Sequence, residues 1–276
     1  MRSERPPRRQ KDTLKDLNVR PSKGRGQNFL IRPEITESIV NFGSPPAGKH
    51  VVEIGPGTGA MTSYLAKLAS ERLTLIEIEP NFCEHLKSAY PEAEILNQDV
   101  RRADLSQIGS ELYVFGNIPY VFSSEIIFHL IEHRASVKQA VLMLQKEFAE
   151  RLAASPGGRD YGSISIAVQL YADVELGPIV PGDSFHPPTK VESQVMKLTF
   201  LPQPRIVIDD LKHFEWVVRA AFSQRRKKLI NSLMSRGKWR KEVIMVALEQ
   251  AEISPGIRAE QLAIGQFAAL AEALPL

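Results

Sequence analysis

The sequence predicts an α/β fold built on a parallel sheet, followed by a small all-helical domain. Between residues 50 and 145, short apolar runs typical of buried strands alternate with stretches of helical length. Such alternation needs crossover connections, which make neighbouring strands parallel and cover both faces of the sheet with helices. Beyond residue 205, apolar residues recur at helical spacing. A chain of 276 residues with 43% hydrophobic content can build a large domain and a small one.

Each element of the larger domain is predicted from a local pattern. Strands are identified by apolar and β-branched runs, and helices by the stretches between them, the first capped by Thr58. After Arg151 the rhythm changes to a loop, then to the alternating β-branched pattern of SISIAVQLYADVEL, then to a closing strand. In order, we expect strands at 50–55, 72–79, 93–99, 112–117, 140–145, 163–176 and 190–200, helices at 58–70, 81–89 and 124–133, and a loop at 155–162.

The pattern divides the chain into three parts. Residues 1–22 are polar and basic and contain proline, and are expected to form a flexible tail. Residues 23–202 form the α/β domain, which ends at the proline-marked linker LPQPR. Residues 203–276 form the helical domain.

Charge is unevenly distributed along the chain. Residues 1–25 hold nine Lys or Arg and three Asp or Glu, and residues 205–276 hold twelve and eight. The segment between them holds fourteen and twenty-one, so an acidic middle lies between two basic ends. Basic ends suit contact with a polyanion, although a solvated tail and helix face would look the same.

The bulk composition also bears on location and metal binding. The single cysteine, Cys83, excludes an internal disulfide framework and suits a reducing cytosol. The sequence contains no run of eighteen apolar residues, so we expect no membrane span. Acidic residues near its start argue against a transit peptide. The sequence has no Cys/His cluster that would predict a metal site, and His186 has no partner at metal-ligand spacing. We therefore expect a cytoplasmic protein without a metal, and a monomer by default.

A glycine loop joins the first strand to the first helix. Gly55-x-Gly57-x-x-Ala60 permits a tight turn and close approach of the backbone to a ligand. Glu77 ends the second strand, 22 residues after Gly55, where it can accept hydrogen bonds from ribose hydroxyls. Asp99 ends the third strand and is a candidate for the amino group of an adenine. Ligands of open parallel sheets collect at these strand ends, and the pattern fits NAD or S-adenosylmethionine.

The fourth strand favours S-adenosylmethionine because it ends in Asn117-Ile118-Pro119-Tyr120. The amide oxygen of Asn117 and the carbonyl of Ile118 can accept hydrogen bonds from an exocyclic adenine nitrogen, which is a poor nucleophile until it is held in line with a methyl donor. Pro119 fixes the turn, and Tyr120 offers a ring for stacking worth roughly 1–3 kcal/mol. The other interpretation is a β-turn with a packed tyrosine.

The chain resembles the KsgA-type ribosomal RNA adenine N6-dimethyltransferases over nearly its whole length. The resemblance is carried, in order, by GQNFL (26–30), EIGPGTGAMT (53–62), GNIPY (116–120), MLQKEFAERL (143–152), DYGSIS (160–165), FHPPTKVES (185–193), AFSQRRKKLINSL (221–233) and IRAEQL (257–262). Ile118 replaces a more usual leucine, which should leave its carbonyl in place.

The resemblance implies a class I (Rossmann-like) S-adenosylmethionine methyltransferase domain with a helical C-terminal domain. The implied reaction is double N6-methylation of two adjacent adenines in a 3′-terminal loop of small-subunit (16S) rRNA, on the immature 30S subunit. Tyr120 and Phe185 would sandwich the flipped adenine. The implied cofactor contacts are Asn28, Leu30, Gly55, Gly57, Glu77, Asp99, Val100 and Asn117.

The expected RNA-binding surface is the densest basic cluster of the C-terminal domain. Arg225, Arg226, Lys227 and Lys228 are predicted to lie on a helix, pointing in different directions, and to bind backbone phosphates with strong salt dependence. Lys146, just past the fifth strand, is a weaker candidate near the cleft.

Other functions remain open at this point. A large-subunit rRNA adenine methyltransferase conferring macrolide resistance shares the catalytic motifs, although the C-terminal IRAEQL match argues against it. A DNA adenine methyltransferase and an NAD-dependent dehydrogenase fit less well. A non-catalytic assembly or nucleic-acid-binding factor could keep the fold, but the intact Glu77, Asp99 and Asn-Ile-Pro-Tyr argue against that interpretation.

Overall fold

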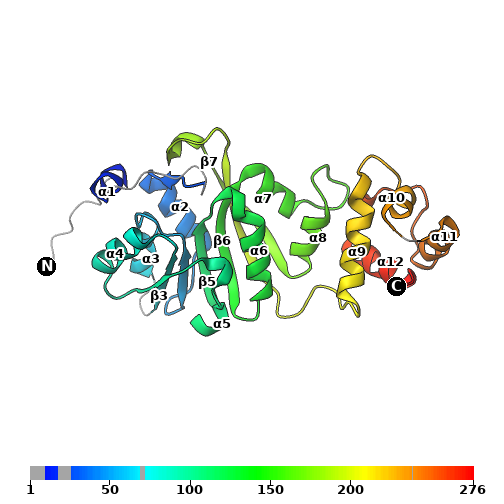
Figure 1. Cartoon of the computed structure of the whole chain (residues 1–276), viewed down its shortest axis with the longest axis horizontal. Coiled ribbons are helices and arrows are strands. Elements are labelled where there is room, and N and C mark those ends of the chain that lie inside the picture. The colour runs from blue at the N-terminus through cyan, green and yellow to red at the C-terminus, as the bar shows by residue number, and fades with distance from the viewer. Residues whose placement is uncertain (1–9, 18–25, 69–71, 238) are drawn as a thin grey trace. The chain divides into compact units, whose positions relative to one another are not determined.

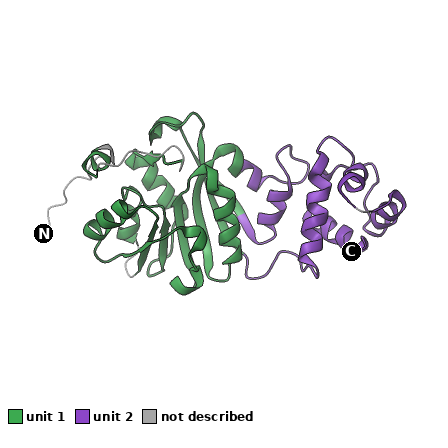
Figure 2. Cartoon of the chain, in the orientation of Figure 1, with its two compact units in different colours: residues 1–149, 174–200 green, residues 150–173, 201–276 purple. Residues whose placement is uncertain are grey.

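The computed structural model describes residues 10–17, 26–68, 72–237 and 239–276 (Figure 1). The chain divides into two compact units (Figure 2). Unit 1 comprises residues 1–149 and 174–200, and unit 2 comprises residues 150–173 and 201–276. This differs from the predicted start of the helical domain at residue 203, because Tyr161, Ile166 and Leu170 are buried in the core of unit 2.

A seven-stranded sheet, counted over the described residues, forms the centre of unit 1, in the order β4-β3-β2-β5-β6-β9-β7. β2, β3, β4, β5 and β6 pair in parallel as expected, whereas β9 runs antiparallel to β6, so the sheet is mixed. The strands are β2 (Val51–Ile54), β3 (Leu73–Glu77), β4 (Glu94–Asn97), β5 (Leu112–Asn117), β6 (Val137–Gln145), β7 (Ala172–Val180) and β9 (Ser193–Phe200).

Two short strands form a second sheet in unit 1. β1 (Phe29–Leu30) pairs antiparallel with β8 (Phe185–His186), and Leu30 lies opposite Phe185. This pairing joins two stretches that are far apart in the sequence, GQNFL and FHPPTKVES. It fixes the position of the loop before β1.

The helices of unit 1 connect these strands, and the last of them crosses the unit boundary. They are α1 (Gln10–Asp16), α2 (Pro33–Gly43), α3 (Thr62–Leu68), α4 (Pro80–Ala89), α5 (Leu105–Ile108), α6 (Ser123–Glu132) and α7 (Lys146–Ala153), with short 3₁₀ turns η2 (Val100–Arg102) and η3 (Tyr120–Phe122).

Three local predictions need correction. The first crossover helix begins at Thr62 rather than after a Thr58 cap, because Gly57 (φ +54°) and Gly59 (φ +82°) hold the preceding segment in turns. The tail predicted as flexible contains α1, whose Leu14 is 4% exposed within the core of unit 1. The rest of the tail, residues 1–9 and 18–22, lies outside the described part.

The third correction concerns the alternating segment at 163–176. Its first half forms α8 (Ser163–Gln169) instead of a strand, and only the second half enters β7. Ser165 explains the change, since its hydroxyl accepts a hydrogen bond from the Gly162 N–H at 3.1 Å and donates one to the Arg151 carbonyl at 2.6 Å. The first bond satisfies a backbone donor at the start of the helix.

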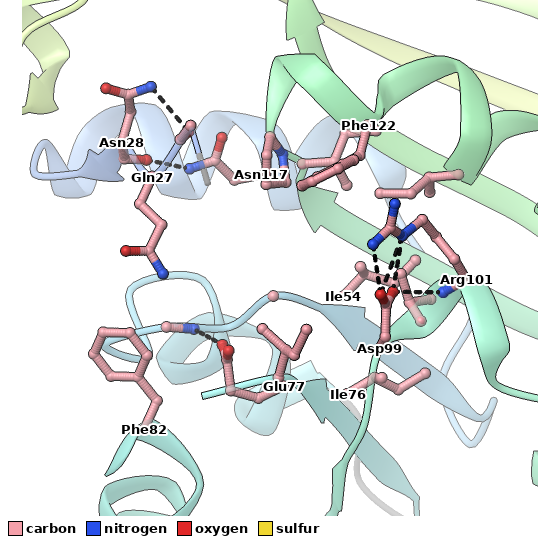
Figure 3. A pocket seen from close by; sticks show the side chains of 18 of the residues that line it. Gln27, Asn28, Ile54, Ile76, Glu77, Phe82, Asp99, Arg101, Asn117 and Phe122 are labelled. Atoms are coloured by element: carbon pink, nitrogen blue, oxygen red, sulfur yellow. Dashed lines mark hydrogen bonds and ion pairs between the residues drawn. The ribbon is translucent and has the colours of Figure 1, made fainter. Parts of the chain in front are cut away.

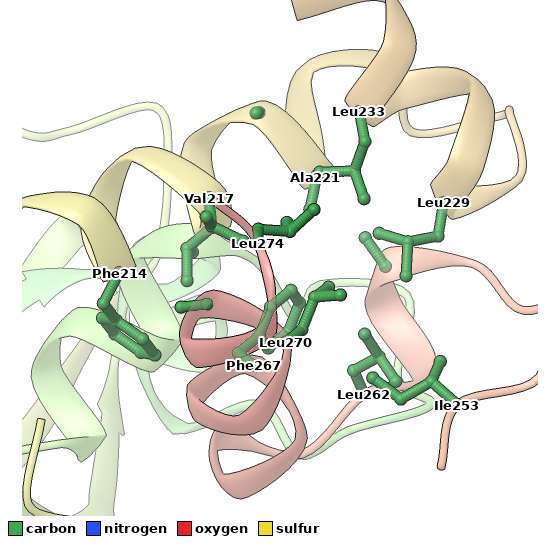
Figure 4. Close-up of a cluster of buried hydrophobic side chains, with 14 of the residues drawn as sticks. Phe214, Val217, Ala221, Leu229, Leu233, Ile253, Leu262, Phe267, Leu270 and Leu274 are labelled. Atoms are coloured by element: carbon green, nitrogen blue, oxygen red, sulfur yellow. The ribbon is translucent and has the colours of Figure 1, made fainter. Parts of the chain in front are cut away.

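Unit 2 is helical, as the spacing of its apolar residues predicted. Asp210 caps α9 by accepting a hydrogen bond from the His213 N–H at 2.9 Å. Figure 4 shows side chains from the helices of this unit meeting in one core, with Phe267 and Leu270 of the last helix among them. Beyond α8, the helices are α9 (Leu211–Ala221), α10 (Leu229–Arg236), α11 (Lys241–Gln250) and α12 (Ile264–Ala273).

Candidate functional site

A cavity of about 270 Å³ lies in unit 1 at the carboxyl ends of β2, β3, β4 and β5 (Figure 3). Ligands of open α/β sheets bind at this edge. Most lining residues come from the loop before β1, the glycine turn, the ends of β2, β3, β4 and β5, and the turn after β5, and the rest come from β1, α4 (Pro80–Ala89) and α6 (Ser123–Glu132). They are Gly26, Gln27, Asn28, Phe29, Ile54, Gly55, Gly57, Ile76, Glu77, Ile78, Phe82, Gln98, Asp99, Val100, Arg101, Asn117, Ile118, Pro119, Tyr120, Phe122 and Ile126.

The glycine turn leaves room on the cavity side. Gly55 has φ +63°, a left-handed conformation that disfavours other residues, and a Cβ added there would meet no atom within 4 Å. Gly57 also has positive φ, and a Cβ there would lie 2.9 Å from the ring of Phe29. Gly55 therefore presents bare backbone to the cavity, and Gly57 lets β1 pack close to the turn.

Glu77 is a nearly buried carboxylate, 5% exposed, at the end of β3. Its Oε2 accepts a hydrogen bond from the Gly57 N–H at 3.0 Å, and its Oε1 accepts one from the Glu79 N–H at 2.9 Å. These bonds fix the carboxylate beside the glycine turn. The residue predicted to bind ribose hydroxyls thus lines the cavity in a defined orientation.

Asp99 follows β4 and is held by one residue, Arg101. The Arg101 Nη2 donates to Oδ2 at 2.6 Å, its Nε donates to Oδ1 at 3.0 Å, and its backbone N–H donates to Oδ1 at 3.0 Å. These hydrogen bonds hold the pKa of Asp99 below its usual range. Asp99 is therefore ionised and oriented at neutral pH, and Val100 beside it also lines the cavity.

Asn117 ends β5 and connects it to the loop before β1. Its Nδ2 donates to the backbone carbonyl of Asn28 at 2.9 Å, while the Asn28 side chain donates to the Gly26 carbonyl at 3.2 Å. The bond to Asn28 fixes the orientation of the Asn117 carboxamide, and so leaves Oδ1 free to act as an acceptor. The predicted pair Asn28 and Asn117 therefore meets at one wall of the cavity.

Tyr120 lines the same cavity, and its hydroxyl contacts a residue that does not line the cavity. The Tyr120 Oη lies 2.6 Å from the Ser193 Oγ, and Ser193 is fully buried at the start of β9. Ile118 and Pro119 also line the cavity. The Asn-Ile-Pro-Tyr segment thus faces the glycine turn and both carboxylates.

The structure does not bring two predicted residues to the cavity. Leu30 is 4% exposed and Phe185 is 2% exposed, and both belong to the core of unit 1. Their β1–β8 pairing places them opposite each other, and neither is among the residues that line the cavity. Phe185 is therefore buried in the core of unit 1, and its role as the second stacking face for a base stays a prediction.

The predicted RNA-binding residues lie outside the cavity. Residues 225–228 occupy the turn between η5 (Phe222–Gln224) and α10, rather than a helix, and all four are exposed. Arg225 donates to the Tyr161 carbonyl at 3.1 Å, which ties this turn to the loop before α8. Lys146 in unit 1 forms an ion pair with Glu192 at 2.8 Å, so its charge is partly neutralised.

Sequence reasoning missed several lining residues. Arg101 and Phe122 lie two residues beyond predicted site residues, so proximity to Asp99 and Tyr120 was a usable signal. Phe82, which packs edge-to-face on Phe29 with centroids 5.6 Å apart, gave no signal because it looks like any apolar residue of a helix. Among the described residues no group of side chains has a metal-binding arrangement, and none of their helices is long and apolar enough to span a membrane.

Sequence reasoning also assigned no role to Glu53, a buried acid in β2 just before the glycine turn. Glu53 in β2 is 2% exposed and accepts a hydrogen bond from the Thr62 hydroxyl at 2.6 Å. Burial raises the pKa of Glu53 to about 8, the hydroxyl acting against that rise and the Glu77 charge adding to it. Glu53 therefore keeps its proton at neutral pH and supports the turn as a neutral acid.

Comparisons with known proteins agree over almost the whole chain. A family model described as ribosomal RNA adenine dimethylase matches residues 20–275. The chain is 40% identical to ribosomal RNA small subunit methyltransferase A of Anoxybacillus flavithermus and 38% identical to that of Latilactobacillus sakei. Each alignment covers 97% of this chain, with 95% and 94% of the relatives.

Two solved structures are also similar. A dimethyladenosine transferase from Plasmodium falciparum has a TM-score of 0.76 at 28% identity, covering 88% of this chain and 95% of that one. The 23S rRNA methyltransferase ErmE has a TM-score of 0.69 at 26% identity, covering 90% of this chain and 99% of that one.

Proposed function

The chain belongs to the ribosomal RNA adenine dimethylase family, and we propose that it transfers methyl groups from S-adenosylmethionine to N6 of two adjacent adenines in a 3′-terminal loop of small-subunit rRNA. The products are N6,N6-dimethyladenosines. We place this reaction on the immature 30S subunit in the cytoplasm, with the enzyme acting as a monomer.

One observation carries this proposal. Asn117 and Tyr120 line the same cavity as Gly55, Glu77 and Asp99. A dinucleotide-binding enzyme needs the last three residues. An amide oxygen and an aromatic ring at the same cavity are what an enzyme that holds the amino group of a base needs in addition.

The cavity suits the methyl donor. The bare backbone at Gly55 leaves space for a ligand, and two oriented acidic side chains lie at the ends of β3 and β4. In our proposal Glu77 accepts hydrogen bonds from the ribose hydroxyls and Asp99 accepts one from the adenine amino group of the donor. S-adenosylmethionine, when bound, supplies an electrophilic methyl group.

The chain's own residues then act on the target adenine. Its N6 is a weak nucleophile because the lone pair is delocalised into the ring. In the first transfer the Asn117 Oδ1 and the Ile118 carbonyl accept the two N6–H hydrogens, and in the second transfer one of them accepts the hydrogen that remains. These bonds align the lone pair and favour a pyramidal nitrogen. After each transfer the methylated nitrogen is cationic and releases its proton to water, so no side chain is needed as a base. Catalysis in this account comes from positioning and from dipoles.

Tyr120 holds the base flat. Stacking on its ring contributes roughly 1–3 kcal/mol, and the Ser193 contact keeps the ring from rotating away. The exposed turn 225–228 would bind phosphates of the surrounding RNA. Arg225 has a partner within the chain, so Arg226, Lys227 and Lys228 are the main candidates.

The proposal is tested by methyl transfer to small subunits from a strain that lacks these modifications. The purified protein, the subunits and methyl-labelled S-adenosylmethionine are incubated, and the rRNA is digested to nucleosides for mass analysis. We expect N6,N6-dimethyladenosine. Its absence would contradict the proposal, as would a label found only in large subunits offered in parallel.

The large-subunit outcome is included because ErmE shares the fold. The small-subunit relatives are more similar, at 38–40% identity against 26%. The same assay tests the non-catalytic alternative, in which the protein binds small subunits and transfers no methyl group.

A further inference from the structure

Arg101 connects the end of β4 to the segment after the Asn-Ile-Pro-Tyr motif. Its guanidinium lies between the Asp99 carboxylate and the Phe122 ring (Figure 3), with Cζ 4.1 Å from the ring centroid. Its Nη1 also binds the Glu125 carboxylate at 2.5 Å. Three contacts on three sides therefore fix this guanidinium, whose side chain is 29% exposed.

The hydrogen bonds to Asp99 have a consequence for ligand binding. An ionised carboxylate has about four acceptor positions. Three donors of Arg101 bind this carboxylate: the backbone N–H donates to Oδ1, Nη2 donates to Oδ2, and the single Nε hydrogen is shared between Oδ1 at 3.0 Å and Oδ2 at 3.2 Å. Three hydrogens are therefore set against four acceptor positions. Since Asp99 also lines the cavity, one acceptor position remains for a donor group of a ligand.

The planar fork of the guanidinium sets the orientation of that acceptor. Binding through both Nε and Nη2 defines the plane of the carboxylate, which a single point contact does not do. A carboxylate held in this way accepts a hydrogen bond from an amino group and repels a carbonyl oxygen at the same place. The arrangement therefore selects a 6-aminopurine over a 6-oxopurine.

We propose that Arg101 is a positioning residue that, by holding the Asp99 carboxylate, makes the cavity selective for the 6-amino group of the cofactor's adenine. The inference rests on the proposed function, because it takes the cavity as the site of S-adenosylmethionine. It assigns a role to a residue that touches Asp99 rather than the reacting atoms.

The opposite role of Arg101 is also physically reasonable and gives a different result. If Arg101 blocked Asp99 instead of orienting it, removing the guanidinium would free the carboxylate and strengthen cofactor binding. The two roles therefore differ in the sign of the effect on affinity.

The test compares two ligands that differ only at the purine 6 position. Dissociation constants for S-adenosylhomocysteine and its deaminated counterpart, S-inosylhomocysteine, are measured with the full-length protein, Arg101→Ala and Arg101→Lys. Arg102→Ala is the matched control, since Arg102 is the next residue, is exposed and does not line the cavity. Thermal unfolding shows whether each variant is folded.

The unmodified protein should prefer the amino ligand by about 10- to 100-fold, the range expected for one hydrogen bond to a charged group. Arg101→Ala should lower this ratio about tenfold and should weaken amino-ligand binding more than oxo-ligand binding. Arg101→Lys should behave similarly, because an ammonium cannot bind both oxygens in a fork. Arg102→Ala should keep the original ratio.

The ratio separates positioning from mere support of the cavity, because a collapsed cavity weakens both ligands equally. An unchanged ratio in folded Arg101→Ala would overturn the inference, as would tighter binding of S-adenosylhomocysteine or an unmodified protein that does not discriminate. If the unmodified protein bound neither ligand, the proposed function itself would fail.

Discussion

At the scale of single residues, the site depends on side chains that are held by neighbours outside the cavity. Gly57 and Glu79 orient Glu77, and the Asn28 carbonyl orients Asn117. Each functional atom therefore has its direction set before any ligand arrives, which is what positioning catalysis requires.

The Ser193 contact gives the first prediction. Ser193→Ala removes the partner of the Tyr120 hydroxyl, so the ring gains freedom. We expect the methyl-transfer rate at saturating substrate to fall about five- to thirtyfold, because a bond of roughly 1–2 kcal/mol is lost at a positioned group. Cofactor affinity should stay within about twofold, since Ser193 does not line the cavity.

Tyr120→Phe is the partner in a double-mutant cycle with Ser193→Ala. If the hydroxyls act through each other, the double variant should be no slower than the slower single variant. If the double variant is instead slower by the product of the two single effects, the contact between the hydroxyls has no role in transfer.

Glu53 gives a prediction about stability and pH. Burial raises the pKa of Glu53 to about 8, far above its unfolded value of 4.5. The folded state therefore holds this proton more tightly, and the resulting stability is complete below pH 4.5 and is lost as pH rises through 8. Glu53→Gln carries no titrating proton, so its unfolding temperature relative to the unmodified protein should increase between pH 5.5 and 8.5.

The control for this series is Glu84→Gln, an exposed carboxyl on α4. Its unfolding temperature should track that of the unmodified protein across the same range. A difference for Glu53→Gln that stays constant with pH would mean that Glu53 is ionised in the folded protein.

At the scale of elements, the glycine turn between β2 and α3 decides how close a ligand can come. Its left-handed residues delay the start of the helix to Thr62 and keep the backbone bare at the cavity. The pairing of β1 with β8 supports the turn from the other side, because the Phe29 ring packs where a Gly57 Cβ would be.

Replacing Gly55 separates backbone strain from ligand binding. Gly55→Ala places a methyl group in the cavity and forces φ +63°, while Gly157→Ala forces φ +88° in an exposed loop of unit 2. Both should lose about 1–2 kcal/mol of unfolding free energy from the left-handed conformation. Only Gly55→Ala should lose cofactor affinity, by at least about tenfold in calorimetry. Equal affinity in the two variants would show that the ligand does not approach this turn.

The elements also show what a sequence pattern can and cannot predict. β5 was predicted with its observed bounds, because a buried parallel strand is a continuous apolar run. The 163–176 segment was mispredicted, since a hydroxyl at Ser165 that caps a helix looks identical, in sequence, to a polar residue of an alternating strand.

The same distinction applies to the site. Glu77, Asp99 and Asn117 were predictable because parallel strands end at one edge, so position along the chain implies proximity in space. The burial of Phe185 was not, because burial of a loop aromatic is decided by its partner strand β1. The Arg101 contacts depend on rotamers of Phe122 and Glu125, which no spacing rule specifies.

At the scale of the whole molecule, the chain separates the chemical site from its main basic cluster. The cavity belongs to unit 1, whereas the exposed turn 225–228 belongs to unit 2. The chain passes between the units at residues 149–150, 173–174 and 200–201. The proposed methyl transfer and the proposed RNA binding by this turn can therefore be tested by separate substitutions.

The basic turn gives a prediction for RNA binding. Arg226→Gln with Lys227→Gln should lower the slope of log affinity against log salt by about 1.4–1.8, the value expected for two lost phosphate contacts. Lys87→Gln with Lys138→Gln changes the net charge equally at exposed sites of unit 1 and should leave the slope unchanged. Equal slopes for the two double variants would remove this turn from the binding surface. Cofactor affinity should be unchanged in both.

The central claim is that the Asn117 amide acts on the reacting nitrogen, and the most direct test is a single-turnover measurement with Asn117→Ala. Dissociation constants for S-adenosylmethionine and the small subunit should rise by no more than about tenfold relative to the unmodified enzyme, because Tyr120, Glu77, Asp99 and the basic turn remain. The rate of methyl transfer from the bound complex should fall by at least about a hundredfold, as for loss of a positioned polar group in an active site. A transfer rate close to that of the unmodified enzyme would contradict the claim, and so would affinity and rate that fall by the same factor.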